Sequence, residues 1–135
     1  ACSARASLVT VDTDAIATAI AEGMPYHVSE DAGRVLGFVT AFQFRGGPGY
    51  AHTFEHSIHL LPEAQGCGLG RALMAVIEAD LKARGVHSLF AGVSGENEAG
   101  ARFHAALGYA HVARLPQVGW KFGRWHDLVL MQKIL

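Results

Sequence analysis

A glycine-rich turn between an extended apolar segment and a helical pattern constrains this chain more than any other feature. Residues 60–71 read LLPEAQGCGLGR, and a run with helical periodicity follows them. The glycines at 66, 68 and 70 lack the β-carbon that would keep a ligand away from the backbone. Several N–H groups can therefore face one point, beside the partial positive charge of a helix N-terminus. The turn is predicted to bind phosphate or pyrophosphate, with an ordinary connecting loop as the alternative.

The spacing of this turn differs from two common phosphate-binding motifs. A Walker P-loop needs Lys and then Ser or Thr after its last glycine, and Arg71 and Ala72 stand there instead. The dinucleotide fingerprint needs a third glycine, which is missing after Gly68 and Gly70. The pattern that does fit is Gln65-x-x-Gly68-x-Gly70 behind a strand and a proline. It resembles the acyl-CoA pyrophosphate loop of the GNAT superfamily of N-acetyltransferases.

This resemblance implies acetyl-CoA as the co-substrate. A strand interrupted near Leu60 would leave a backbone N–H free for the thioester oxygen. Asn97 would cap the helix that it opens, hydrogen-bond the pantetheine arm, or do both. The residues expected to contact acetyl-CoA are Leu60, Leu61, Gln65, Gly66, Cys67, Gly68, Leu69, Gly70, Arg71 and Asn97.

Composition narrows the class of protein. A chain of 135 residues, of which 50% are hydrophobic, is expected to form one domain over 1–135. Its formal charge of −1 argues against a general nucleic-acid surface. No apolar run reaches the roughly 20 residues of a membrane span, and no signal peptide is visible. Cys2 and Cys67 are too few for a disulfide framework, so free thiols and a cytoplasmic location are expected.

The order of helical and strand patterns predicts a mixed α/β fold with a mostly antiparallel sheet flanked by helices. Strands are expected over 26–29, 34–44, 53–61, 88–93, 109–115 and 127–134, with a loop over 116–125. Helices are expected over 70–84 and 97–107, and an earlier one starts at 12–14 and stops at Gly23. The GNAT plan would begin with a further strand and helix. Only 7–11 offers such a strand, so this region is expected to be abbreviated or incomplete.

Glu55 is the predicted general base. Side chains alternate along a strand, so Glu55 lies on the opposite face from Phe54 and His56, where it is either solvated or in a cleft. An α-amino group, with a pKa of about 8, is mostly protonated at neutral pH, and only the neutral amine attacks a thioester. A carboxylate in a semi-enclosed site can take that proton, directly or through water.

His104 is the predicted second catalytic group. It follows Phe103 in the run FHAALGY, which resembles the GNAT helix-to-strand signature. A tyrosine often holds this position there and protonates the departing thiolate. Histidine can fill the same role, and a surface or capping histidine is the alternative. No metal site is predicted, because strand alternation separates His59 from His52 and His56.

Three further runs resemble the phosphinothricin N-acetyltransferase family, which also acetylates methionine sulfoximine. They are TFEHSI at 53–58, SGENE at 94–98 and VGWKFGRWHDLVLMQ at 118–132. The resemblance covers about 25–135 and includes Phe44, Arg45 and Tyr50. It implies Glu55 as general base, His104 as a second catalytic group, and a homodimer with substrate sites near the interface.

An acceptor that carries a carboxylate and a phosphinate or sulfoximine needs cations. Arg45 is the first candidate, because a guanidinium binds a carboxylate in bidentate fashion. Lys121 and Arg124 are weaker candidates, and Tyr50 and Trp120 are expected to wall the pocket.

Gly47 stands where many members of that family carry a second arginine. One cation that could bind an anionic group of the acceptor is therefore missing, and a smaller or less anionic amine fits as well. The leading prediction is an N-acetyltransferase that moves acetyl from acetyl-CoA to a small amino-acid-like amine by general-base-assisted direct attack. The alternatives are the same chemistry on a polyamine, an aminoglycoside or a protein N-terminus, and a non-catalytic acyl-CoA sensor. The presence of Glu55 and His104 argues for the enzyme.

Overall fold

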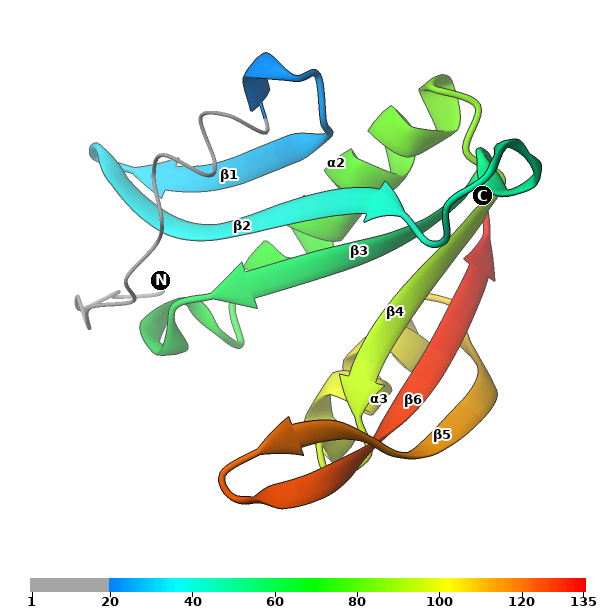
Figure 1. Cartoon of the computed structure of the whole chain (residues 1–135). Coiled ribbons are helices and arrows are strands. Elements are labelled where there is room, and N and C mark those ends of the chain that lie inside the picture. Colours follow the sequence, from blue (N-terminus) through cyan, green and yellow to red (C-terminus); the bar gives the residue numbers. More distant parts are fainter. Residues whose placement is uncertain (1–19) are drawn as a thin grey trace. The chain divides into compact units, whose positions relative to one another are not determined.

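A computed structural model describes residues 20–135 of the chain (Figure 1). These residues divide into two compact units: unit 1 holds 20–42 and 57–85, and unit 2 holds 43–56 and 86–135. The single domain expected from the length stays a prediction. The strand predicted over 7–11 and the helix start predicted at 12–14 lie outside the described residues.

Unit 1 contains a β-hairpin and one long helix. Strands β1 (Tyr26–Asp31) and β2 (Arg34–Gln43) pair antiparallel. The two residues between them, Ala32 and Gly33, have φ of 50° and 81°, as two-residue hairpin turns require. Helix α2 (Leu69–Ala83) follows the short helix η2 (Pro62–Ala64) and contacts β1. Its predicted apolar face is confirmed, since the buried side chains of this unit include Val39, Ala41, Leu73, Met74, Ile77 and Leu81.

Polar contacts hold the C-terminal half of α2 against β1 and the residues that precede it in unit 1. The Nε2 atom of His27 lies 2.8 Å from Oδ2 of Asp80. Arg84 donates to the other oxygen of Asp80 at 2.8 Å and to the carbonyl oxygen of Gly23 at 2.6 Å. These contacts join the helix to β1 and to the residues just before it.

Unit 2 is built on four paired strands and a helix. Residues 53–56 of β3 (Thr53–Leu60) pair parallel with β4 (Ser88–Ser94). Strand β4 pairs antiparallel with β6 (Arg124–Ile134), and β6 pairs antiparallel with β5 (Ala110–Lys121). Helix α3 (Glu98–Ala106) connects β4 to β5, and a short helix, η1 (Pro48–Tyr50), precedes β3. The buried side chains of this unit include Leu89, Ala91, Val93, Tyr109, Val129 and Met131.

The strand order is β1-β2-β3-β4-β6-β5. Pairing is antiparallel in β1–β2, β4–β6 and β5–β6 and parallel in β3–β4. This confirms a mixed α/β fold with a mostly antiparallel sheet.

The loop predicted over 116–125 is wrong. Strand β5 continues to Lys121 and β6 already begins at Arg124, so the segment is a β-hairpin. The glycines and Pro116 suggested a loop, but β5 is the last strand in the order, and an edge strand tolerates proline. The turn residues Phe122 and Gly123 have φ of 55° and 72°, which is typical of a tight hairpin.

Candidate active site

The glycine-rich turn forms an open cradle at the start of α2. Gly66 and Gly68 both have φ of 80°, and a β-carbon on either residue would meet no heavy atom within 4 Å. Such a backbone conformation favours glycine, and the open space leaves the backbone accessible. Gly68 is the N-cap of α2, so the N–H groups of the first helical turn have no intrahelical acceptor. These residues fit a pyrophosphate group, which helix N-termini bind through such N–H groups.

The side chains of this turn are mostly exposed. Gln65 and Arg71 are exposed, Leu69 is partly buried, and Gly70 is buried. Cys67 is disulfide-bonded, which contradicts the free thiol expected at this position. Cys2, the other cysteine of the chain, lies outside the described residues.

At the end of β3, the backbone N–H of Leu60 points away from β2. Leu61 donates its N–H to the carbonyl oxygen of Leu36 at 2.9 Å. Because N–H groups alternate in direction along a strand, the N–H of Leu60 points away from β2. The pairing of β3 with β4 ends at His56. The role of the Leu60 N–H as a donor to the thioester oxygen stays a prediction.

Glu55 presents an unpaired carboxylate on β3 within unit 2. Its side chain is partly buried, and this burial raises the pKa of Glu55 above its ordinary value. No hydrogen bond or ion pair to this carboxylate is found among residues 20–135. Its Oε1 atom lies 3.5 Å from the point at which Gly92 of β4 would carry a β-carbon. Such a carboxylate is suited to accept a proton.

His104 of α3 and His56 of β3 form a buried pair. Their Nε2 atoms lie 2.9 Å apart, and the two residues are only 6% and 5% exposed. The Nδ1 atom of His104 lies 2.8 Å from the carbonyl oxygen of Gly100, which can only accept, so Nδ1 carries a proton. The Nε2 atom of a neutral His104 then accepts from the Nε2–H of His56, whereas the Nε2–H of a protonated His104 donates to Nε2 of His56. Burial and the nearby His104 lower the pKa of His56 to about 3.

Glu55 and His104 lie on opposite faces of the β3–β4 pair. His56 contacts His104, and Glu55, the preceding residue in the strand, points to the other side. Its carboxylate lies beside Gly92, whereas the neighbouring Ala91 is buried on the face of the histidine pair. The structure does not bring the predicted base and the predicted acid into contact.

Asn97 caps α3. Its Oδ1 atom accepts a hydrogen bond from the N–H of Gly100 at 2.9 Å, as N-cap side chains do. The capping role is confirmed, and the contact of Asn97 with a pantetheine arm stays a prediction.

Two predicted substrate residues, Arg45 and Tyr50, lie together. The guanidinium carbon of Arg45 is 5.0 Å from the ring centroid of Tyr50, a cation–π contact. The side-chain amide of Gln43 donates to the carbonyl oxygens of Arg45 at 2.7 Å and Gly47 at 3.0 Å. Both substrate candidates are exposed, so the guanidinium is accessible to an anionic ligand.

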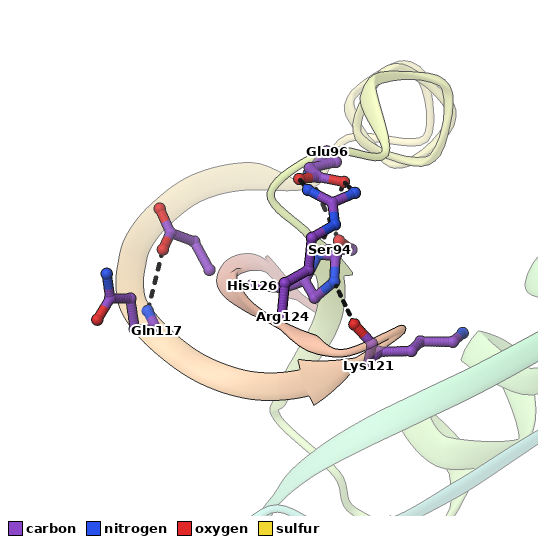
Figure 2. Close-up of polar contacts among 7 residues, drawn as sticks. Ser94, Glu96, Gln117, Lys121, Arg124 and His126 are labelled. Atoms are coloured by element: carbon purple, nitrogen blue, oxygen red, sulfur yellow. Dashed lines mark hydrogen bonds and ion pairs between the residues drawn. The ribbon is translucent and has the colours of Figure 1, made fainter.

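The other two predicted substrate residues lie on the β5–β6 hairpin. Trp120, 61% exposed, packs against Trp125 with the ring centroids 4.8 Å apart. The Nζ atom of Lys121 lies 5.1 Å from the ring centroid of Phe122. The carbonyl oxygen of Lys121 accepts from Nε2 of His126 at 3.0 Å, while its side chain points away from that contact (Figure 2).

Arg124 is bound by Glu96. Its two terminal nitrogens donate to the two carboxylate oxygens at 2.6 and 2.8 Å (Figure 2). This guanidinium holds the pKa of Glu96 below its ordinary value. The pair joins the segment before α3 to the end of the hairpin. Arg124, which the sequence analysis names as a weaker candidate to bind the acceptor anion, is therefore already paired with Glu96.

Sequence reasoning missed the contact between His56 and His104. A signal was present, because His56 alternates with Phe54 and Ile58 on one face of a strand, the pattern of a buried face. Within residues 20–135, no group of three or more His, Cys, Asp or Glu side chains is placed to hold a metal ion. None of the helices described in that range has the length and apolar character needed to cross a membrane.

Comparison with known proteins decides the family. The model of the acetyltransferase (GNAT) family matches residues 6–109. The chain belongs to the GNAT family. It is 42% identical over 110 residues to the L-amino acid N-acyltransferase MnaT of Escherichia coli (strain K12), over 82% of this chain and 64% of that protein. It is 40% identical over 114 residues to a phosphinothricin N-acetyltransferase of Alcaligenes faecalis, over 84% of this chain and 58% of that protein.

Solved structures confirm the GNAT fold. The putative acetyltransferase yncA from Salmonella typhimurium with acetyl-CoA matches with a TM-score of 0.85 and 40% identity, over 94% of this chain and 76% of that chain. A phosphinothricin acetyltransferase from Sinorhizobium meliloti in complex with AcCoA matches with a TM-score of 0.82 and 34% identity, over 91% and 67%. The GNAT chain described above spans less than two thirds of the length of the two curated relatives, at 64% and 58%.

Proposed function

We propose that this GNAT chain transfers acetyl from acetyl-CoA to the amino group of a small amino-acid-like acceptor of the phosphinothricin or methionine sulfoximine type. The observation that carries the proposal is the partly buried, unpaired carboxylate of Glu55, on the strand that leads directly into the glycine-rich turn. The names of similar proteins support the acceptor class, since they specify L-amino acids, methionine sulfoximine and phosphinothricin.

In this mechanism Glu55 removes a proton from the ammonium group of the acceptor, directly or through one water. Its raised pKa brings the carboxylate closer to the working pH, where a general base is most effective. Acetyl-CoA supplies the activated acetyl thioester. The free amine attacks the carbonyl carbon, a C–N bond forms and the nitrogen loses one further proton to solvent. The C–S bond breaks, and the thiolate takes a proton. The N–H of Leu60 stabilises the negative charge that develops on the carbonyl oxygen.

The glycine-rich turn holds the pyrophosphate of the co-substrate in this proposal. Gly66 and Gly68 allow close approach to the backbone, and the first turn of α2 supplies N–H donors and a favourable dipole. Arg71, exposed in that first turn, adds a positive charge. Asn97 contacts the pantetheine arm while it caps α3.

His104 protonates the departing thiolate in this proposal. Donation from Nε2 of His104 to the thiolate requires that this atom carries a proton and that its hydrogen bond with Nε2 of His56 opens. A histidine can change protonation near neutral pH.

The acceptor is oriented by its negative charge. Arg45 binds its carboxylate in bidentate fashion, held over Tyr50 by the cation–π contact. In the hairpin, Trp120 lines the acceptor pocket and Lys121 adds a second positive charge. With Gly47 in place of a second arginine, acceptors that carry one anionic group suit this site best.

A homodimer is the second part of the proposal. The hairpin exposes three aromatic side chains, Trp120, Phe122 and Trp125, at 61%, 83% and 57%, and a large exposed apolar patch marks an interaction site. Light scattering after size exclusion should give twice the mass of the chain. A monomer at every concentration would reject the dimer. The cytoplasmic location stays a prediction.

The experiment that tests the function is thiol release from acetyl-CoA across a panel of amines. The panel contains L-methionine sulfoximine, L-methionine sulfone, phosphinothricin, spermidine and an aminoglycoside. Turnover with the first three is expected. Turnover only with spermidine or the aminoglycoside would reject the acceptor class, and binding of CoA without turnover of any amine would favour a sensor.

A further inference from the structure

Gly92 stands in the middle of β4 beside the carboxylate of Glu55. Glycine weakens a strand, because it has the largest entropy to lose and no side chain to pack. It is found inside strands at a bulge, at a sharp bend, where another backbone comes close, or where a ligand comes close. The first three reasons can be checked at Gly92.

None of these three reasons applies. The register of β4 with β6 is continuous from Ser88 to Ser94, so Gly92 is not at a bulge. Its φ is not positive, so its backbone conformation does not call for glycine. A β-carbon at this position would lie 3.4 Å from Cδ1 of Leu128 and 3.5 Å from Oε1 of Glu55, which are ordinary contacts with side chains. An alanine therefore fits at this position.

Gly37 of β2 shows the contrast. A β-carbon on Gly37 would lie 2.5 Å from Cδ2 of Leu60 and 2.8 Å from the carbonyl oxygen of His59. The close approach of a backbone accounts for that glycine. At Gly92 no neighbouring backbone atom excludes a side chain, and the residue is exposed.

We infer that Gly92 is a specificity-determining residue, because its missing β-carbon leaves the space in which the acceptor carbon that bears the amino group lies, between Glu55 and Leu128. This inference rests on the proposed function. It deepens that function by naming the acceptor as an amine on a substituted carbon, as in an α-amino acid.

Distances show why a side chain here would matter. An amine that gives its proton to Glu55 directly must come within about 2.9 Å of a carboxylate oxygen. A methyl group on residue 92, which is an exposed position, would stand 3.5 Å from Oε1. The nitrogen and the substituted carbon behind it would compete with that methyl group for the same space. The Cδ1 atom of Leu128, 3.4 Å from the same point, adds an apolar contact beside this space.

The test uses Gly92→Ala and the bulkier Gly92→Val, with L-methionine sulfone as acceptor. We expect kcat/KM to fall about ten-fold or more in Gly92→Ala and further in Gly92→Val, since a misplaced acceptor loses rate steeply. The Kd of Gly92→Ala for acetyl-CoA should match the wild type, and its Tm should be no lower, since alanine weakens a strand less than glycine does. Ser94→Thr is the matched control, because it adds a methyl group two residues along the same face of β4 and should leave kcat/KM unchanged.

The outcomes separate the inference from the proposed function. If the wild type acetylates no amine, the function itself fails. If the wild type is active and Gly92→Ala keeps kcat/KM within about two-fold, only the role of Gly92 fails. A crystal structure of the wild type with an acetyl-CoA–amino acid bisubstrate analogue gives a test that needs no variant. The α-carbon of the analogue should lie within about 4.5 Å of Gly92, and an α-carbon bound elsewhere would overturn the inference.

Discussion

The Nε2 atoms of His56 and His104 lie 2.9 Å apart in the interior of unit 2. One hydrogen fits between them, and Nδ1 of His104 donates a second hydrogen bond to the carbonyl oxygen of Gly100. The pair thus links β3 to α3 by one hydrogen bond between two buried rings. Burial and the neighbouring His104 oppose a positive charge on His56, and both lower its pKa.

The pair predicts that acid destabilises the folded chain. The pKa of His56 is about 3 when folded and about 6.5 when unfolded. Between these values the unfolded state binds more protons, so the free energy of unfolding falls as the pH is lowered, by at most about 1.4 kcal/mol per pH unit for one proton. Urea unfolding of the wild type at pH 7, 6, 5 and 4 measures this slope. His56→Gln keeps a donor without the titration, and its slope should be shallower; equal slopes would contradict the assignment.

Glu55→Gln should lower kcat at neutral pH by about 100-fold or more if the carboxylate is the general base. The wild-type rate should fall as the pH drops through the raised pKa of Glu55, because the protonated carboxyl cannot accept a proton. The variant should lack this acidic limb and regain rate at alkaline pH, where free amine is abundant. A pH profile of kcat/KM in both proteins measures the effect. An unchanged rate in the variant would remove Glu55 from the mechanism.

The same substitution should stabilise the fold at neutral pH. Burial raises the pKa of Glu55 in the folded state. At a pH between the pKa of the unfolded state and that of the folded state, the folded state therefore keeps a proton that the unfolded state has lost. Folding stability then falls as the pH rises through the folded pKa of Glu55. Glu55→Gln should unfold at a higher Tm than the wild type at pH 8, with the difference shrinking at pH 4. A lower Tm at pH 8 would show that the carboxylate has a stabilising partner.

Arg45→Ala should raise KM for acceptors with a carboxylate more than for the matching amides. The guanidinium, held over Tyr50, is proposed to bind the carboxylate in bidentate fashion. Arg45→Lys keeps the charge but loses the planar fork, so its KM should lie between those of the wild type and Arg45→Ala. Steady-state kinetics on an amino acid and its amide measure the difference. The same rise for both acceptors would show that Arg45 does not recognise the anion.

Glu96 and Arg124 should act as one unit on the hairpin that carries Trp120 and Lys121. Removal of either partner breaks the bidentate pair. Glu96→Ala and Arg124→Ala should therefore each raise the KM for the acceptor severalfold, and the double variant should show the same rise as either single variant. High salt should weaken the coupling. The control is Arg102→Ala, from an exposed pair with Glu98 at 3.8 Å, which should leave KM unchanged. Additive effects would show that the pair does not act as a unit.

Much of the fold could be predicted because its signals are local. The apolar face of α2 follows from the helical spacing of Leu73, Met74, Ile77 and Leu81, and all four are buried. The β5–β6 hairpin could not be predicted in the same way. Pro116 and Gly119 indicate a loop by themselves. Only the pairing of β5 with β6 on both sides of the register shift between Leu115 and Gly119 makes this segment part of a hairpin.

Some features of the candidate site could likewise be predicted from the sequence, and others could not. The glycines of the turn at 66 and 68 could be recognised from spacing, because their positive φ is a property of the local backbone. The position of Glu55 opposite to His56 follows from strand alternation. The partner of His56 could not be predicted, because His104 lies 48 residues away along the chain.

The sequence by itself determined the glycine-rich turn, the strand that leads into it and the carboxylate on that strand, since each depends on φ preferences and on a period of two or 3.6 residues. Tertiary structure alone decided that His104 is held by His56, that Arg124 is held by Glu96, and that Gly92 leaves space beside Glu55. Each of these is a contact between elements distant in the chain, and its geometry arises only when strands pair and helices pack against them.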